Sequence, residues 1–300
     1  MLVVKANLLY KEKYEMAEFI ISGFADEIDE NTGLQFTHLN KLGISYFEPR
    51  GINGKNISAL TEEEVKALKS QMDEYGIKAS SIGSPIGKIK ITDDFEPHME
   101  LLKNVIRTAK ILDTKYIRIF SFFMPEGEDP ANYRDEVLRR MKAMADLAEK
   151  EGVILLHENE KDIYGDIAVR CKDIFENVKS PALKGVFDPA NFVQCGEKTY
   201  PDAFNMLSPY IVYMHIKDAM FSDGKVVPAG YGEGNIKQIL TELYNSGYEG
   251  FVSLEPHLGS FAGLADLELD DTMLQLEESG PDKFSLAHSA LTKIINEIKE

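Results

Sequence analysis

Cysteine is scarce in this chain of 300 residues, which contains only Cys171 and Cys195. Two thiols are too few for a disulfide-stabilised secreted fold and fit a reducing compartment, so we interpret both as ordinary packing residues. Residues 1–19 lack the continuous apolar core of a secretion signal, because lysines and glutamates interrupt them. No apolar run approaches the roughly 20 residues that span a bilayer. We therefore expect a cytoplasmic protein that does not enter a membrane.

Positive charge is also in short supply. The chain has 33 Lys and Arg residues against 50 Asp and Glu residues, which gives a formal net charge of −17 at pH 7. Such a charge repels a phosphate backbone, and no local run of Lys or Arg offsets it. The sequence therefore argues against nucleic acid as a partner.

Short apolar runs alternate with amphipathic stretches of about 10 to 18 residues, which is the pattern of repeated βα units. Eight of the apolar runs have the length of a strand, and they cover residues 19–23, 44–48, 77–82, 115–120, 153–158, 183–188, 211–216 and 251–255. Helix signals fall between these runs. Thr61-Glu62-Glu63-Glu64 is a capping box, and Gly76 supplies a left-handed stop after the helix that follows.

Eight βα units favour a single (β/α)8 TIM barrel over residues 1–300, because eight parallel strands can close on themselves. We expect an N-terminal extension at residues 1–18 and a long acidic loop before the last helix at residues 258–281. The main competitor is a doubly wound open sheet. That fold usually carries a Gly-rich phosphate turn after its first strand, and Gly23-Phe24-Ala25-Asp26 is not such a turn.

Four polar residues end successive predicted strands, namely Glu158, Asp188, His215 and Glu255. Taken singly, each is better explained as a strand-end group that bonds to a neighbouring loop. Together they predict a shared site at the end of the barrel where such enzymes place their chemistry. Three buried carboxylates repel one another unless a positive ion lies between them. The hard ligand set predicts one divalent ion, with Mn²⁺ as first choice and Mg²⁺, Co²⁺ or Zn²⁺ as alternatives.

Motifs at five strand ends carry a resemblance to a known family. They are Gly23-Phe24-Ala25-Asp26-Glu27, His157-Glu158-Asn159, Phe187-Asp188-Pro189-Ala190-Asn191, His215-Ile216-Lys217-Asp218 and Leu254-Glu255-Pro256-His257. With them the chain resembles the xylose isomerase-like barrel superfamily, in particular its sugar phosphate isomerase/epimerase branch, over residues 20–298. This branch includes ketose 3-epimerases and inosose dehydratases. The resemblance implies that the four strand-end residues are metal ligands and that Glu158 and Glu255 are also the acid/base pair.

The chain departs from its relatives in three respects. Asn191 stands where many epimerases and the apurinic endonucleases of the superfamily have a histidine, and the six histidines of the chain are too few for the three-zinc endonuclease site. Tryptophan is absent, so an aromatic wall has to use residues such as Phe24, Phe122, Phe123, Phe192 or Tyr231.

The glycine-rich segment 230–235 resembles a family loop but is weak evidence for phosphate binding, because it follows no strand directly.

The predicted chemistry is proton transfer next to a carbonyl that the metal polarises, through an enediolate. Two glutamates on opposite faces of a carbon make an epimerase, and return of the proton to the neighbouring carbon makes an isomerase of a keto-sugar, sugar phosphate or cyclitol. Two alternatives stay open. One is a lyase of the inosose dehydratase or 3-keto-C-glycoside type, and the other is a non-catalytic carbohydrate-binding barrel. The expected partner is a small carbohydrate, and a homo-oligomer is compatible with the sequence.

Further polar residues near the strand ends complete the predicted site. Lys217 is expected to bind a substrate oxygen or to orient Glu158, although a strand-end lysine is as often a solvated charge. Contacts with substrate hydroxyls are predicted for Glu48, Arg50, Asn159, Asn191 and His257. The alternative for Glu48 and Arg50 is an internal ion pair. For Arg118 the alternative is a buried charge that groups on neighbouring strands satisfy. His157 lies on the opposite strand face from Glu158 and is expected to be structural.

Overall fold

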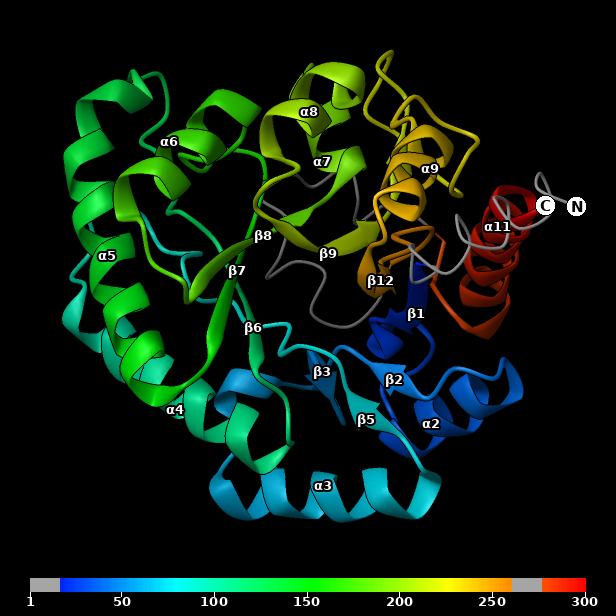
Figure 1. Ribbon diagram of the computed structural model, residues 1–300. Helices are drawn as coiled ribbons and strands as arrows, with labels where there is room; N and C mark the ends of the chain where they lie inside the picture. The colour runs from blue at the N-terminus through cyan, green and yellow to red at the C-terminus, as the bar shows by residue number, and fades with distance from the viewer. Residues whose placement is uncertain (1–16, 261–276) are drawn as a thin grey trace, which may run out of the picture.

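The computed structural model describes residues 17–260 and 277–300. Residues 1–16 of the predicted N-terminal extension and residues 261–276 of the predicted long loop lie outside the described residues. In the part that is described, six parallel strands form one curled sheet in the order β1-β12-β9-β8-β7-β6 (Figure 1). Their bounds are β1 Glu18–Gly23, β6 Tyr116–Ile119, β7 Ile154–Glu158, β8 Leu183–Phe187, β9 Ile211–Ile216 and β12 Glu249–Leu254.

Two further strands close the ring. β2 (Tyr46–Phe47) pairs in parallel with β5 (Lys78–Ala79). The amide of Glu48 donates to the carbonyl of Gly23 at 2.9 Å, which joins β2 to β1. Ile82 bridges to Ile117 in parallel, which joins the end of β5 to β6. The eight predicted strands and the (β/α)8 barrel are thereby confirmed, although regular pairing in β2 and β5 covers only two residues each, fewer than their apolar runs predicted.

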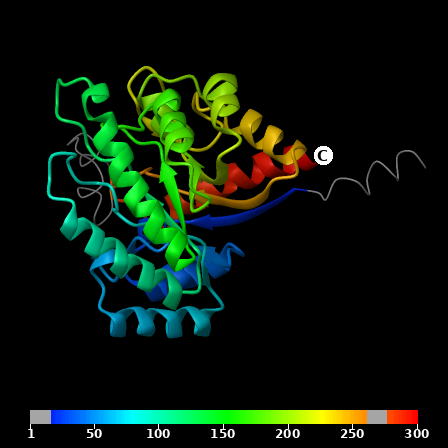
Figure 2. The same ribbon diagram turned by 60° about the vertical axis from the view of Figure 1, so that its left-hand side comes forward.

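Helices surround the ring of strands on the outside (Figures 1 and 2). The longer ones are α2 Thr32–Lys41, α3 Glu62–Tyr75, α4 Glu96–Ile111, α5 Arg134–Glu151, α6 Ala168–Val178, α9 Ile236–Asn245 and α11 Pro281–Lys299. Shorter elements are η1 Ala25–Glu27, η2 Ile57–Ala59, η3 Pro130–Tyr133, α7 Pro189–Gln194, η4 Thr199–Ala203 and α8 Phe204–Leu207, with the small hairpins β3 Gly51–Ile52 to β4 Lys55–Asn56 and β10 Asp218–Ala219 to β11 Val226–Val227. The capping box of Thr61 and Glu64 is present at α3, and Gly76 ends that helix with φ of 70°. None of the helices in the described ranges is long and apolar enough to cross a membrane.

Strand alternation places apolar side chains on both faces of the strands. The main apolar core lies between the strands and the helices, and a smaller cluster of Leu156, Val186 and Tyr213 joins three neighbouring strands. The Tyr213 hydroxyl donates to Glu48 Oε2 at 2.8 Å, across the ring from β9 to β2. His157 takes the opposite face, where its ring meets the edge of Phe175 on α6 at 6.0 Å between centroids. The inward face of β9 therefore leads from Tyr213 directly to His215.

One buried histidine supports the loop between β5 and α4. The amide of Gly87 donates to Nε2 of His98 at 2.7 Å. At Gly87 φ is 92°, and a Cβ there would lie 2.1 Å from the carbonyl oxygen of Phe120, so the loop passes very close to β6. Burial, with a smaller contribution from Arg140, lowers the pKa of His98 from 6.5 to about 4.

Acid should weaken the fold in part through His98. The pKa of this group in the folded protein lies below its unfolded value, so the unfolded chain binds more protons between these two values and stability falls as the pH falls through that range. In His98→Gln the side chain can still accept from Gly87 but does not titrate. The loss of unfolding free energy between pH 7 and pH 5, measured by urea denaturation, should be about 1 to 2 kcal/mol smaller than in the wild type. Equal losses in both proteins would contradict this role.

Candidate functional site

The four residues that end successive strands converge at the C-terminal end of the barrel. Each of Glu158, Asp188, His215 and Glu255 offers one ligand atom, and these atoms all lie within 4.8 Å of one another. Glu158 ends β7, Asp188 directly follows β8, His215 lies on β9, and Glu255 directly follows β12. All four side chains are buried. We call these four residues the acidic cluster.

Two asparagines fix the position of Asp188 in the acidic cluster, Asn159 through its side chain and Asn191 through its backbone amide. Asn159 accepts from the amide of Asp188 at 2.9 Å and donates to its carbonyl oxygen at 2.8 Å. Asp188 Oδ1 caps α7 by accepting from the amide of Asn191 at 3.0 Å, which leaves Oδ2 for the cluster. The side-chain Nδ2 of Asn191 donates to Glu158 Oε1 at 3.3 Å. Both asparagines therefore support the cluster, and their predicted contacts with substrate stay predictions.

His215 lies between two glutamates. Its Nδ1 is 2.9 Å from Glu158 Oε1, and its Nε2 is 3.3 Å from Glu48 Oε2. Burial acts to lower the pKa of His215, but the carboxylates of Glu158 and Glu48 outweigh it and raise the pKa well above 6.5. A carboxylate on the far nitrogen of a ligating histidine orients the ring and fixes its tautomer. Glu48, which also accepts from Ser253 at 2.9 Å, thus directs Nδ1 towards the cluster.

Lys217 bridges two of the carboxylates. Its Nζ lies 3.2 Å from Asp188 Oδ2 and 3.2 Å from Glu255 Oε2, and its side chain is 3% exposed, so it is not a solvated surface charge. Burial raises the pKa of Asp188 to about 7, although Lys217 acts in the opposite direction. Burial also acts to raise the pKa of Glu255, but Lys217 and His257 outweigh it and hold that pKa well below its usual value. The two carboxylates therefore occupy electrostatically different positions.

The acidic cluster fits a divalent ion. Glu158 Oε2 and Asp188 Oδ2 are buried and accept no hydrogen bond among the described residues, although Arg118 Nη1 lies 3.4 Å from the first and Lys217 Nζ 3.2 Å from the second. Buried acceptors without hydrogen bonds are costly, and a bound cation would satisfy them more fully than these ion-pair contacts do. Three carboxylates and one imidazole are donors that Mg²⁺, Mn²⁺ or Zn²⁺ accepts in proteins. The residues present therefore supply both the charge and the donor atoms that such an ion needs.

Arg50 and His257 lie on the side of the cluster formed by β1 and β12. Arg50 Nη1 is 3.0 Å from Glu255 Oε1, and its Nε and Nη2 pair with the two oxygens of Asp26 at 2.8 and 3.0 Å. His257 has a φ of 45°, and its backbone amide donates to Glu27 Oε2 at 2.7 Å. The Nε2 atom of the His257 ring lies 3.4 Å from Glu255 Oε1. Arg50 is thus ion-paired, though to residues other than the Glu48 that the sequence suggested.

Sequence reasoning gave no role to three charged residues near the cluster. Asp26 and Glu27 lie in η1, three and four residues beyond the end of β1, and this place just after a strand was the available signal. Glu160, two residues beyond Glu158, pairs with Lys88 at 3.2 Å, and both side chains are buried.

The segment 230–235 folds around the Asp218 carboxylate, which accepts hydrogen bonds from the backbone amides of Gly230, Gly232 and Gly234 at 2.8 to 3.0 Å. Those three amides are therefore already occupied by a protein anion.

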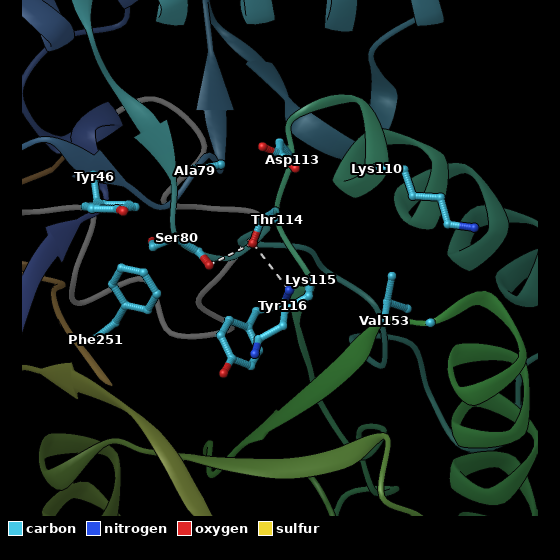
Figure 3. A pocket seen from close by; sticks show the side chains of 11 residues that line it. Tyr46, Ala79, Ser80, Lys110, Asp113, Thr114, Lys115, Tyr116, Val153 and Phe251 are labelled. Atoms are coloured by element: carbon cyan, nitrogen blue, oxygen red, sulfur yellow. Dashed lines mark hydrogen bonds between the residues drawn. The ribbon is translucent and has the colours of Figure 1, made fainter. Parts of the chain in front are cut away.

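A cavity of about 500 Å³ opens at the other end of the barrel, near the starts of the strands (Figure 3). Tyr46, Tyr116 and Phe251 contribute to its lining. The Thr114 hydroxyl donates to the carbonyl oxygen of Ser80 at 2.8 Å and accepts from the amide of Tyr116 at 3.3 Å. None of the residues that line this cavity belongs to the acidic cluster. Barrel enzymes place their chemistry at the opposite face.

Comparison with known proteins gives consistent matches. The sequence is 23% identical over 194 residues to the 3-dehydroshikimate dehydratase of Bacillus anthracis, which covers 63% of this chain and 66% of that protein. The matches to curated relatives span 56% and 66% of those proteins' own lengths. The structure of a D-tagatose 3-epimerase-like protein aligns with a TM-score of 0.70 at 16% identity and covers 94% of this chain and 98% of that one. A barrel protein from Mycobacterium smegmatis in complex with magnesium aligns with a TM-score of 0.64 at 17% identity, covering 95% and 98%.

The structural likenesses at these low identities establish the fold. The family match goes further, because the xylose isomerase-like TIM barrel family matches residues 36–273, which is most of the chain. That range contains all four residues of the acidic cluster. The chain belongs to the xylose isomerase-like TIM barrel family.

Proposed function

We propose that this protein is a divalent-metal-dependent isomerase or epimerase that acts on a keto-sugar, a sugar phosphate or a cyclitol. The observation that carries the proposal is the burial of Glu158 and Glu255 in one cluster with Asp188 and His215. Two carboxylates that face one small volume can remove a proton from a carbon and return one to it. Structural neighbours named as a D-tagatose 3-epimerase-like protein and a 3-keto-D-glucoside 4-epimerase support the same reaction class.

Glu158, Asp188, His215 and Glu255 are the proposed ligands of one divalent ion, for which Mn²⁺ is the first choice. When bound, such an ion polarises a carbonyl group and stabilises the negative charge that develops on its oxygen. A structural neighbour in complex with magnesium supports a divalent ion of this kind, and Mg²⁺, Co²⁺ and Zn²⁺ are alternatives. The hydrogen bond between Glu48 and His215 would hold the imidazole in the orientation that this role requires.

The proposed proton transfer uses residues with distinct surroundings. Arg50, Lys217 and His257 lie within 3.0 to 3.4 Å of Glu255 and keep this carboxylate ionised, which is the form that a proton acceptor needs. Glu158 is the proposed partner that returns a proton to the opposite face. Lys217 is the proposed donor to a substrate oxygen. The side chains of Glu158, Lys217 and Glu255 are all buried, which excludes bulk water and strengthens the charge interactions between them.

A lyase is the second candidate. The match to a 3-dehydroshikimate dehydratase supports it, and loss of a β-hydroxyl needs the same two groups. One carboxylate would remove the proton next to the carbonyl, and the other would protonate the departing hydroxyl, which leaves as water. An epimerase returns the proton instead, so the products separate the two reactions.

Metal content tests the acidic cluster. The purified wild type, after incubation with Mn²⁺ and removal of excess ion, should retain about one ion per chain by elemental analysis, because four donors define one coordination sphere. Asp188→Asn removes one charge and should weaken binding at least tenfold in a calorimetric titration. Asp173→Asn is the matched control, since Asp173 pairs with Arg134 on the outer helices. Equal affinity in the three proteins would refute the site.

Turnover tests Glu255. Glu255→Gln keeps the size of the side chain but removes a ligand charge and a proton acceptor, so kcat should fall at least roughly 100-fold on the true substrate. Glu136→Gln, which alters a carboxylate paired with Arg139 and Arg140 on α5, serves as the control and should keep wild-type activity. Circular dichroism checks that both variants fold. Wild-type turnover by Glu255→Gln would remove this residue from the mechanism.

Deuterium exchange separates an enzyme from a binding protein. A ketose or inosose that the wild type accepts in D₂O with Mn²⁺ should gain deuterium at the carbon next to its carbonyl, because a carboxylate proton exchanges with solvent before it returns. Exchange should need the metal and should disappear in the glutamate variant whose carboxylate removes the observed proton. Product formed without deuterium still indicates an enzyme with a shielded transfer. Tight binding with neither exchange nor product would identify a carbohydrate-binding barrel.

A further inference from the structure

Arg118 is a buried cation beside the acidic cluster. It lies on β6 inside the ring, is 2% exposed, and its Nη1 is 3.4 Å from Glu158 Oε2 and 3.6 Å from Glu255 Oε1. Its guanidinium carbon lies 4.9 Å from the ring centres of both Phe24 and Phe120. Two aromatic rings and two glutamates therefore restrict the position of this guanidinium next to the site.

Two nitrogens of Arg118 are unsatisfied. Nε and Nη2 are buried and have no hydrogen-bond partner among the described residues. These two nitrogens form one edge of the guanidinium, the edge that matches the two oxygens of a carboxylate. Arg50 uses the same edge for the two oxygens of Asp26, at 2.8 and 3.0 Å. Leaving such donors buried without a partner costs free energy, so the fold retains an edge that suits a ligand.

The other cations of the site already have carboxylates of their own outside the acidic cluster, with one exception. Arg50 has Asp26, and Lys88 has Glu160. The carboxylates nearest to Arg118 are Glu158 and Glu255, and those that Lys217 contacts are Asp188 and Glu255. All of them belong to the acidic cluster. Lys217 reaches those carboxylates at 3.2 Å, whereas Arg118 stays at 3.4 Å or more. Arg118 is thus the cation least committed to a protein carboxylate.

We propose that the Nε and Nη2 edge of Arg118 binds a carboxylate group of the substrate. The proposal rests on the proposed function and narrows it: the substrate is a keto-acid of the sugar or cyclitol class, and Arg118 determines this specificity. Asp26 on Arg50 shows that this edge pairs with a carboxylate in this protein, at 2.8 and 3.0 Å. The planar fork also fits a phosphate, so the probes include 6-phosphates to separate the two anions. The rings of Phe24 and Phe120 hold the guanidinium that presents this edge.

Binding of matched probes tests the proposal. The Mn²⁺-loaded full chain is titrated in a calorimeter with D-fructuronate and D-tagaturonate, with the neutral D-fructose and D-tagatose, and with the 6-phosphates of both ketoses. At least one uronate should bind roughly tenfold or more tighter than its neutral counterpart. Arg118→Lys keeps the charge beside the glutamates but loses the fork, so it should weaken uronate binding roughly 10- to 100-fold and leave binding of the neutral ketose within about threefold.

Arg140→Lys is the matched control. Arg140 is also buried, lies 5.0 and 5.4 Å from the ring centres of Phe95 and Phe122, and has an unpartnered Nη1, but it belongs to α5. This variant should keep the wild-type preference for the uronate. Arg118→Gln, checked by circular dichroism, provides a second variant if the lysine side chain disturbs the fold. Metal content of each variant is measured, so that loss of the ion is not mistaken for loss of the carboxylate contact.

The outcomes separate the inference from the proposed function. Equal affinity for uronates and neutral ketoses, or an equal effect of Arg118→Lys on both, overturns the inference even if the neutral ketoses exchange deuterium. Tighter binding of the 6-phosphates than of the uronates identifies the anion as a phosphate and also overturns it. Selective uronate binding that depends on Arg118, without deuterium exchange or product, supports the inference and contradicts the proposed reaction.

Discussion

Three carboxylates buried within a few ångströms of one another impose the main electrostatic constraint on this barrel. Glu158, Asp188 and Glu255 offer ligand atoms within 4.8 Å of each other, together with His215. Burial alone would favour their neutral forms, and it raises the pKa of Asp188 to about 7. Such a group of like charges is stable only when cations surround it or an ion lies within it. Much of the polar structure at this end of the barrel meets that requirement.

Cationic residues from several strands and their loops balance the buried carboxylates. Lys217, from β9, bridges Asp188 and Glu255, while Arg50, after β2, links Glu255 to Asp26. These contacts fix the carboxylates in place before any ligand arrives, so little reorganisation is needed during a reaction. The same contacts distinguish Glu255 from Asp188, because their pKa values shift in opposite directions. A site with unequal carboxylates is suited to giving different acid/base roles to different groups.

The sequence predicted the barrel because each strand is a local apolar run, and it predicted the acidic cluster because a strand end fixes the height of a side chain in a barrel. It did not predict the pairing of charges across the ring. Arg50 and Glu255 are 205 residues apart, and no local pattern relates them. The partners of Asp26, Glu27 and Glu160 were missed for the same reason, because those pairs also join residues that are distant in sequence. The short regular pairing in β2 and β5 also depends on neighbouring strands, and the apolar runs alone overestimated it.

The central claim is that the acidic cluster is one metal site, and anomalous diffraction from a crystal grown with Mn²⁺ tests it most directly. The account predicts a single strong anomalous peak within roughly 2.5 Å of oxygen or nitrogen atoms of Glu158, Asp188, His215 and Glu255. It also predicts that Lys217 lies beside the ion and not among its ligands. A saturated crystal with no peak between these four side chains, or with its peak elsewhere in the barrel, would contradict the account.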